Sequence, residues 1–503
     1  MLLRRYRLSP RSRLVDSGGK KYLVCDHPLQ IIELNETAWL LLGALDGCTP
    51  VHELVAGLER STLAYLERMV HRGVLAAEYE AAAPETLPGV RVIVPAYGRP
   101  QALSRCLRGL LELDYPSSKL DIVVVDDGSP EPLRNLIKRS ENGDSGITWV
   151  RLDTNRGPAS ARNAAALTDR DLAGKDEVPE IFAFIDSDCL PHPTWLRALV
   201  TVLDDPWIDA AGGATRSLHA TGLLGRYEDA CASLYLGPRA GSVAGEGSPR
   251  PYLPSCNFAV KAGAFHDVGG YQTGWRVGED VDLSWRLHEK GYALFYWPEA
   301  AVQHEYRVSW VAFLGRKRDY ARSEGSLVSR YPGRFARIPG AWAVRSELLA
   351  LAAASIAGGT VSMGWAAATV IALELARAGW RVSRWPKGAP RPGWGDFFAA
   401  LTRTAFAVWV QECRLLVRNT LLFWPVVLAF LPALAGVAGL IFGAGVAGEW
   451  QAKRPPIPLA TFAAGFTGEC LAYSLGRAEG RIAAWWRGPR RIARCLPARD
   501  DGA

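Results

Sequence analysis

The chain has 503 residues, of which 49% are hydrophobic and 22% are charged. This length predicts about three domains, and this composition excludes a disordered chain. The formal net charge of +7 is a mild basic excess for such a length. It does not indicate a nucleic-acid partner, but it suits an anionic ligand or a membrane surface.

The nine cysteines are scattered along the chain, and none of them forms a CxxC pair. An odd number at irregular spacing argues against a disulfide framework or a structural zinc site and favours a reducing compartment. The N-terminal stretch MLLRRYRLSPRSR has no apolar run after its arginines, so we expect no secretory signal. The expected location is the cytosol or the cytoplasmic side of the cell membrane.

Residues 1–83 form the first predicted domain. LVDSGGKKYLVCD predicts a β-hairpin with a Gly-Gly turn, and TAWLLLGALDG, TPVHELVAGL and STLAYLERMVHRGVL predict three short helices. This order is typical of a small winged-helix-like α+β domain. The last helix and the two residues before it carry Arg60, Arg68 and Arg72 but also two glutamates, which disfavours a DNA-recognition face. The proline-containing stretch 81–89 predicts a linker.

Residues 88–340 form the second predicted domain, in which strands and helices alternate. Buried-strand runs stand at 90–95, 120–127 and 181–188, and helical stretches such as PQALSRCLRGLLEL and SARNAAALT lie between them. This alternation predicts a Rossmann-like α/β domain with a parallel sheet, whose ligands gather at the carboxyl ends of the strands.

Acidic and turn-forming residues follow each of these strands. VIVPAYGRP places Tyr97 where its ring can stack under a base. IVVVDDGSP ends in two carboxylates: one can accept the ring N–H of uracil, and the other can stabilise the turn or hold the ribose. IDSDCLP carries Asp186 and Asp188 where a divalent cation can also touch both phosphates. A lone Asp-X-Asp is more often a solvated loop, but this order of motifs favours a nucleotide-sugar site.

VIVPAYGRP, VVVDDGS, NRGPASARN, FIDSD and GEDVDLSWRL together resemble the motifs of GT-A glycosyltransferases of family 2, over about residues 88–335. The resemblance implies a nucleotide-sugar donor, a divalent cation (Mn²⁺ or Mg²⁺) and inversion at the anomeric carbon. Arg162, in the helix that follows the Gly-Pro turn, is assigned to the donor site. The implied uracil-binding positions are Pro95, Tyr97 and Asp127, the ribose-side acid is Asp186, and the metal-binding acid is Asp188.

The resemblance places the catalytic base in the pair Glu279 and Asp280. Inversion by direct displacement needs one carboxylate to take the proton of the acceptor hydroxyl. We expect Asp280 to be this base and Glu279 to orient it, and the reverse assignment stays open. Asp282 and Arg286 are four residues apart on the same predicted helix, which favours a structural ion pair.

His304 follows another predicted strand and matches a second metal ligand of several family members. The alternative is a packing or surface histidine, because imidazole is a borderline ligand for Mg²⁺. The basic run 315–325 offers Arg316, Lys317 or Arg322 to the leaving diphosphate, or it forms a solvated face. The Gln-X-X-Arg-Trp motif of processive family members does not follow the Glu-Asp pair, so processivity by that route is unsupported.

Residues 341–503 predict a helical, hydrophobic, membrane-associated region. Its uncharged runs 348–373 and 419–448 are long enough to cross a bilayer. The segment 374–418 between them carries eight Lys or Arg against three Asp or Glu, and both outer flanks are basic. Two simple spans would place one basic segment outside, against the positive-inside rule. Re-entrant or surface-lying helices avoid this conflict. Spanning helices and a buried hairpin of a soluble domain stay open.

The first domain resembles PqqD-type peptide-recognition domains through YRLSPRSRLVD, KKYLVCD and LNETAWLLLGALDGCTPVHELV. Such domains take a precursor peptide as an added strand. The whole chain resembles glycosyltransferases of mycofactocin biosynthesis. This implies UDP-glucose as donor, the peptide-derived redox cofactor premycofactocin as acceptor, a β-linked oligoglucose product, and contact with the precursor peptide or other maturation proteins. The alternatives are a membrane polysaccharide or glycolipid glycosyltransferase and a non-catalytic peptide-recruiting scaffold.

Overall fold

The computed structural model describes residues 2–26, 29–55, 57–81, 84–138, 146–167, 179–244, 248, 250–275, 277–306, 309–331, 334, 341–383, 385, 388–389 and 393–492. The chain divides into two compact units. The first contains residues 1–220, 232–306 and 388–391, and the second contains residues 221–231, 307–387 and 392–503. The two predicted N-terminal domains therefore share one unit, and the helix that follows residue 309 belongs with the C-terminal helices.

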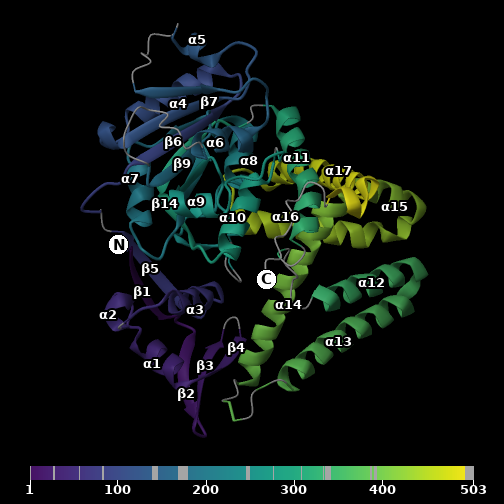
Figure 1. The fold of residues 1–503 in the computed structure, drawn as a ribbon. Coiled ribbons are helices and arrows are strands. Elements are labelled where there is room, and N and C mark those ends of the chain that lie inside the picture. The colour runs from purple at the N-terminus through teal and green to yellow at the C-terminus, as the bar shows by residue number, and fades with distance from the viewer. Residues whose placement is uncertain are drawn as a thin grey trace. The chain divides into compact units, whose positions relative to one another are not determined.

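The N-terminal part of the first unit contains two small sheets and three helices (Figure 1). The strands are β1 (Leu2–Leu8), which pairs with β5 (Leu75–Ala81), and β2 (Ser12–Ser17), β3 (Lys20–Asp26) and β4 (Leu29–Leu34), which form the second sheet. The helices are α1 (Glu36–Ala44), α2 (Val51–Leu54) and α3 (Arg60–His71). The predicted hairpin and the three predicted helices are confirmed. Leu63, Leu66 and Met69 of α3 are buried because their spacing places them on one helix face.

Buried contacts join this part to the α/β part of the same unit. Arg4 Nη1 lies 2.9 Å from Asp205 Oδ2, and the two side chains are 7% and 0% exposed. The backbone N–H of Leu2 donates to the same carboxylate at 3.0 Å, and the Leu2 side chain lies in the core of the α/β part. On α3, Arg60 donates to Asp209 at 2.7 Å. The first 81 residues are therefore packed as part of the larger unit.

Arg4→Ala is expected to lower the free energy of unfolding by about 3–5 kcal/mol, because it leaves Asp205 buried without its partner charge. Arg7→Ala on the same strand is the matched control. The pair between Arg7 and Glu78 measures 3.5 Å and is exposed, so its loss should cost less than about 1 kcal/mol. Urea unfolding of both variants measures the difference. Equal effects would show that the buried pair does not hold the first strand to the α/β part.

The α/β part is built on a nine-stranded sheet in the order β10-β14-β11-β13-β9-β6-β7-β8, with β12 beside β14. Its strands are β6 (Val90–Ala96), β7 (Leu120–Asp126), β8 (Ile147–Arg151), β9 (Ile181–Ile185), β10 (Cys189–Pro191), β11 (Ala210–Ser217), β12 (Gly241–Val243), β13 (Asn257–Lys261) and β14 (Leu294–His304). β6 runs parallel to β7 and β9, whereas β13 runs antiparallel to β9 and β11. The three predicted strands are confirmed, but the sheet is mixed and not purely parallel.

Helices and a short 3-10 turn accompany this sheet. They are α4 (Pro100–Leu111), η1 (Ser117–Lys119), α5 (Leu133–Lys138), α6 (Pro158–Ala166), α7 (Trp195–Leu203), α9 (Ala262–Asp267) and α10 (Glu279–Glu289). β6 is buried along its whole length, as expected for a central strand covered on both faces. Ala161 and Ala165 of α6 are fully buried, and such small side chains let this helix lie close to its neighbours.

The second unit consists of helices (Figure 1). They are α8 (Gly222–Cys231), α11 (Trp310–Arg330), α12 (Ala341–Ala357), α13 (Gly359–Ser383), α14 (Trp394–Thr420), η2 (Leu421–Phe423), α15 (Trp424–Phe430), η3 (Pro432–Leu434), α16 (Ala435–Lys453) and α17 (Leu459–Ile492). Aromatic rings connect three of them: the Tyr227 centroid lies 5.9 Å from that of Phe313 and 5.6 Å from that of Phe462. Lys317 of the predicted basic run is buried and pairs with Glu469 at 2.9 Å, so its charge is already used inside this unit.

Neither predicted hydrophobic run forms one continuous helix. The run 348–373 turns at Gly358 and Gly359, whose φ angles of 71° and 81° end α12 and start α13. The run 419–448 is interrupted at Leu431, because the following Pro432 disfavours helical geometry in the residue before it. Among the described residues, the segments long and apolar enough to cross a membrane are Trp394–Phe430 and Pro432–Lys453, by length and composition only.

Candidate active site

The predicted motifs lie where strands of the sheet end. Tyr97 follows β6 and is 51% exposed, so its ring is open to a ligand. Asp127 follows β7, and Asp188 lies in the turn between β9 and β10. His304 is the last residue of β14, and it stands opposite Cys189 in the pairing of β10 with β14. The sheet therefore brings side chains from distant parts of the sequence to neighbouring strand ends.

The two acids of the Asp-Asp-Gly-Ser turn have different partners. Asp126 accepts the backbone N–H of Ser129 at 2.9 Å and of Leu133 at 3.1 Å. Burial opposes ionisation, but these hydrogen bonds prevail and lower the pKa of Asp126. Asp127 accepts the N–H groups of Arg156 and Gly157, each at 2.8 Å. A carboxylate offers about four acceptor positions, so Asp127 can still accept a ring N–H from a base.

Glycine is required at position 128, where the Asp-Asp-Gly-Ser turn meets the segment that contains Thr154. Its φ is +68°, and an added Cβ would lie 2.6 Å from the carbonyl carbon of Thr154. Both the backbone angle and the lack of space therefore exclude a side chain. This close approach holds the Asp127 turn against the segment that supplies its two N–H donors.

Arg162 forms a buried bridge between two acids that are 93 positions apart. Its Nη2 donates to Asp186 Oδ1 at 2.6 Å and its Nη1 to Glu279 Oε1 at 3.0 Å. Burial works to lower the pKa of Arg162, but the neighbouring acids outweigh it and raise that pKa. With 2% of its surface exposed, Arg162 is occupied by these acids. This arrangement favours a positioning role over the predicted contact with the donor.

Asp280 lies beside this bridge, in the first turn of α10. Burial and then the negative charge of Glu279 raise the pKa of Asp280 to about 7. Glu279 itself is engaged by Arg162. The predicted pair of Asp282 and Arg286 is confirmed at 2.7 Å, with Asp282 fully buried. The first turn of α10 therefore holds two acids that are paired with arginines, Glu279 and Asp282, and one acid with a raised pKa, Asp280.

Asp188 lies in a second charged group. Its Oδ2 is 2.7 Å from Arg99 Nη1, and its Oδ1 is 3.4 Å from His304 Nε2. Arg99 also reaches Glu305 at 3.3 Å, and Arg105 pairs with the same glutamate. Arg99 has a φ of 54°, an unusual angle for a residue other than glycine. A guanidinium group thus neutralises the predicted metal-binding acid in this structure.

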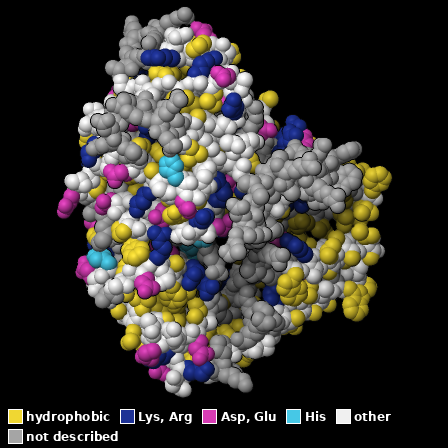
Figure 2. Space-filling model, in the orientation of Figure 1, with side chains coloured by type: hydrophobic (Ala, Val, Ile, Leu, Met, Phe, Trp, Pro, Cys, Tyr) yellow, Lys and Arg dark blue, Asp and Glu magenta, His cyan; other side chains and the backbone are white. Residues whose placement is uncertain are grey.

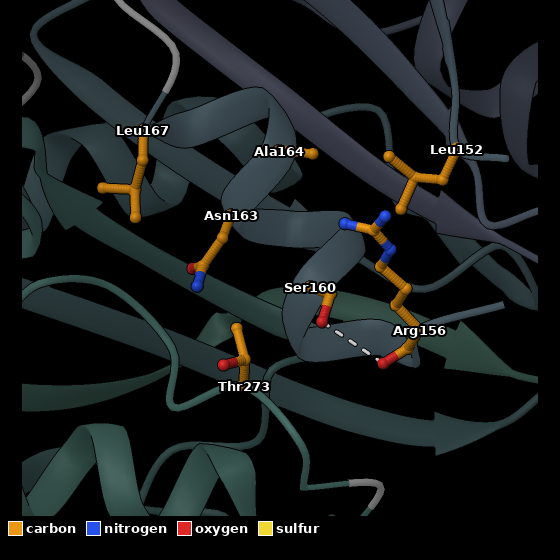
Figure 3. Close-up of a pocket in the computed structure, with 7 residues that line it drawn as sticks. All are labelled: Leu152, Arg156, Ser160, Asn163, Ala164, Leu167 and Thr273. Atoms are coloured by element: carbon orange, nitrogen blue, oxygen red, sulfur yellow. Dashed lines mark hydrogen bonds between the residues drawn. The ribbon is translucent and has the colours of Figure 1, made fainter. Parts of the chain in front are cut away.

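A hollow of about 440 Å³ lies beside α6 (Figure 3). It is lined by Leu152, Arg156, Ser160, Asn163, Ala164, Leu167 and Thr273, so none of the predicted site residues lines it. The Arg156 side chain lines this hollow, while its backbone N–H donates to Asp127. The hollow therefore adjoins the predicted donor-binding turn without containing it.

Comparison with known sequences decides the family. Residues 91–268 match the family described as "Glycosyl transferase family 2". Residues 181–464, more than half of the chain, match "Glycosyl transferase family group 2". The chain belongs to glycosyltransferase family 2.

This family 2 glycosyltransferase is similar to several named proteins. A "Pre-mycofactocin glycosyltransferase" of Mycobacterium tuberculosis is 32% identical over 349 residues, which cover 69% of this chain and 67% of the relative. "Glycosyltransferase AglE" of Haloferax volcanii is 26% identical over 213 residues, 42% of this chain and 65% of the relative. A solved structure, "Mannosyltransferase PcManGT from Pyrobaculum calidifontis in complex with GDP-Man and Mn2+", has a TM-score of 0.42 and 22% identity, and the match covers 69% of this chain and 98% of that one.

The family 2 glycosyltransferase has two site residues that sequence reasoning missed, Arg99 and Glu305. Both contact Asp188: the Arg99 side chain lies 2.7 Å from its carboxylate, and the Glu305 backbone N–H donates to its carbonyl oxygen at 2.9 Å, while the Glu305 side chain pairs with Arg99. Arg99 carries a weak local signal, since it stands between a glycine and the proline that starts α4. Glu305 directly follows His304, but its pairing with residues near position 100 depends on the fold.

The Asp188 group of this glycosyltransferase fits a divalent cation. Oxygen, sulfur and nitrogen atoms of Asp188, Cys189 and His304 lie within 4.8 Å of one another. His304 Nδ1 is buried without a hydrogen-bond partner. Burial and the neighbouring Cys256 raise the pKa of Cys189 well above its ordinary value, and a protonated thiol is a poor ligand. The fitting donors are therefore the Asp188 carboxylate and the His304 imidazole.

Proposed function

We propose that the chain transfers glucose from UDP-glucose to premycofactocin with inversion and builds a β-linked oligoglucose chain. The observation that carries this proposal is the 32% identity over 349 residues to the relative named as a pre-mycofactocin glycosyltransferase. The intact acids Asp127, Asp188 and Asp280 at neighbouring strand ends and helix starts support catalysis, because a non-catalytic scaffold would have no need of them.

We assign the donor nucleotide to the ends of β6 and β7. Tyr97, half exposed, is proposed to stack under the uracil, and Pro95, a buried residue of β6 two positions earlier, is assigned to the same uracil-binding positions. Asp127, held by two backbone N–H groups, is proposed to accept the uracil ring N–H. Asp186 has one oxygen on Arg162 and a side chain 31% exposed, which leaves its other oxygen for a ribose hydroxyl.

We assign a divalent cation, Mn²⁺ or Mg²⁺, to Asp188 and His304. When bound, it supplies positive charge that stabilises the departing diphosphate. Arg99, which now neutralises Asp188, is proposed to turn toward the phosphate oxygens when the cation takes that carboxylate. Glu305 contacts Arg99 at 3.3 Å and is proposed to retain the guanidinium group near the site.

We assign the catalytic base to Asp280. Its raised pKa suits a group that must take a proton near neutral pH, whereas Glu279 is held by Arg162. The Asp280 carboxylate is proposed to accept the proton of the acceptor hydroxyl while the acceptor oxygen bonds to C1 of glucose, the C1–O bond to the diphosphate breaks and UDP leaves. Arg162 is proposed to hold Asp186, the ribose-side acid, and Glu279, the neighbour of the base, in fixed relative positions.

The rate of transfer is expected to rise with pH up to about 7 and to level off above it, because Asp280 must be ionised to act as a base. Stability should change in the opposite direction. Because the folded state keeps a proton that the unfolded state releases, stability falls as pH rises from about 4 to about 7. Asp280→Asn should therefore unfold at a higher temperature than the wild type at pH 8. Rate profiles and thermal unfolding from pH 4 to 9 measure both effects, and a flat wild-type rate profile would remove Asp280 as the base.

We propose that residues 1–83 recognise the precursor peptide or other maturation proteins, as the resemblance to PqqD-type domains implies. The three-stranded sheet β2-β3-β4 supports this proposal, because β2 and β4 are its outer strands and an added strand needs such an edge. We further propose that the region 341–503 holds the enzyme at the cytoplasmic side of the cell membrane. The two apolar helical segments support the membrane proposal.

Acceptor identity separates this proposal from a membrane polysaccharide or glycolipid glycosyltransferase. Purified protein with UDP-glucose and Mn²⁺ or Mg²⁺ is incubated with premycofactocin, with precursor peptide or with lipid acceptors. Mass spectrometry should show successive additions of one hexose to premycofactocin. Transfer to lipid acceptors alone would favour the alternative. Binding of premycofactocin or of precursor peptide with neither transfer nor hydrolysis of UDP-glucose would favour the scaffold.

A further inference from the structure

The second unit contains two helical hairpins whose turns lie inside the uncharged runs. α12 and α13 pack together and join at Gly358 and Gly359. α14 and α16 also pack together, and the segment between them turns at residues 431–434. α12 contacts η3 at the turn of the second hairpin, and Figure 1 shows both turns on the same side of this unit, at the right of the view.

Charged residues of the two hairpins lie just outside the uncharged runs and are paired across the helices. The pairs are Glu347–Arg377 between α12 and α13, Arg345–Glu412 between α12 and α14, and Arg414–Glu449 between α14 and α16. These pairs form a layer of charge that separates the uncharged arms from the rest of the unit.

Beyond this layer the arms expose large apolar side chains. They include Ile356 (53% exposed), Val361 (73%), Trp365 (72%), Phe423 (48%), Phe430 (81%) and Leu440 (50%). Figure 2 shows hydrophobic side chains gathered at the right of the view, where the turns lie. Soluble monomers rarely expose apolar surface of this extent without a partner.

The length of the arms distinguishes insertion from spanning. The uncharged parts of the four arms are 348–357, 359–373, 419–430 and 435–448. At a rise of about 1.5 Å per residue they measure roughly 15–22 Å. The hydrocarbon core of a bilayer is about 30 Å thick, so the uncharged part of each arm is long enough for about one leaflet.

We propose that both hairpins insert side by side into one leaflet of a lipid bilayer and return to the side from which they enter. The partner is lipid and not a second copy of this chain, because both arms and turns are free of charge and the adjoining segment 374–418 has eight Lys or Arg against three Asp or Glu. That excess of positive charge suits anionic head groups. Insertion from one side also leaves every basic segment on that side.

Flotation with vesicles tests the surface. The full chain is expected to float with vesicles of phosphatidylcholine and phosphatidylglycerol. Phe430→Glu and Val361→Glu should each reduce flotation at least tenfold, because a charge within the hydrocarbon region is costly. Leu40→Glu is the matched control, since Leu40 is an apolar side chain 62% exposed in the N-terminal part. Equal flotation of all variants, or flotation of none including the wild type, would overturn the proposal.

Cysteine labelling tests the depth. The labelled positions are created by Ile356→Cys and by Phe430→Cys, in two separate variants. Each variant also carries Cys48→Ser and Cys495→Ser, so that these two cysteines do not react. Of the described cysteines, Cys48 is exposed. In vesicles, a membrane-impermeant maleimide should label neither position from either face, and detergent should restore labelling. Labelling from the far face would show spanning, and labelling from the near face would show surface contact without insertion. Concentration-dependent dimers without flotation would identify a second copy as the partner. All three results overturn the proposal.

This inference extends the membrane partner proposed above, and its failure is distinguishable from failure of the proposed reaction. Transfer to a soluble acceptor is measured on the same variants without vesicles. Phe430→Glu and Val361→Glu should retain that activity while losing flotation, since neither residue belongs to the proposed site. Loss of both properties would show a folding defect, and the cysteine variants then decide the question of insertion.

Discussion

Asp280→Asn is expected to lower the rate of glucose transfer by about 10²- to 10⁴-fold, the usual contribution of a general base. Asparagine keeps the shape of the side chain but cannot take the proton of the acceptor hydroxyl. Affinity for UDP should be unchanged, because Asp280 is assigned to the acceptor side of the site. Steady-state kinetics and calorimetry with UDP measure the two quantities separately. A parallel loss of UDP affinity and rate would move Asp280 into the donor site.

Glu279→Gln is the matched control for this experiment. Its charge helps to raise the pKa of Asp280, so its removal should shift the rise in rate to lower pH. It also breaks the 3.0 Å pair with Arg162, which should reduce the rate through poorer positioning. We expect this loss to be smaller than that of Asp280→Asn. If Glu279→Gln causes the larger loss and removes the pH dependence, the two roles are reversed.

Asp188→Ala is expected to abolish the gain in UDP affinity that Mn²⁺ provides. The variant removes a proposed cation ligand and also frees Arg99, now 2.7 Å away, to approach the phosphates. Binding of UDP in EDTA should therefore be maintained or slightly strengthened, while binding with Mn²⁺ falls to the same value. Calorimetry with and without the metal measures this difference. An unchanged effect of Mn²⁺ would leave the assignment of Asp188 without support.

Glu305→Gln serves as the matched control for the cation site. The Glu305 side chain contacts Arg99 through Nη2, whereas Asp188 is paired with Nη1, and Glu305 is not a proposed ligand. Its variant should keep most of the effect of Mn²⁺ on UDP affinity. If Glu305→Gln and Asp188→Ala behave alike, the effect arises from the position of Arg99 and not from a lost ligand.

The sequence determined the strands, the motifs at their ends and the family, because each of these signals is local. A hydrophobic run followed by acids predicts a strand end wherever it stands, and the strands that end at Ala96, Asp126 and Ile185 lie within a few residues of their predictions. The breaks in the two hydrophobic runs were also readable. Gly358 with Gly359 and Pro432 are local signals of a turn or of a helix break.

The tertiary structure decided which charged groups meet. Arg162 pairs with Glu279 across 117 positions, and Arg99 reaches Asp188 across 89. No periodic pattern in the sequence predicts such a pairing, because the pairing depends on the order of the strands in the sheet. The same reason applies to Arg4 and Asp205, which join the N-terminal part to the α/β part. Local hydrophobic pattern selects each element, whereas the environment that sets the charge of a side chain is assembled when distant elements pack together.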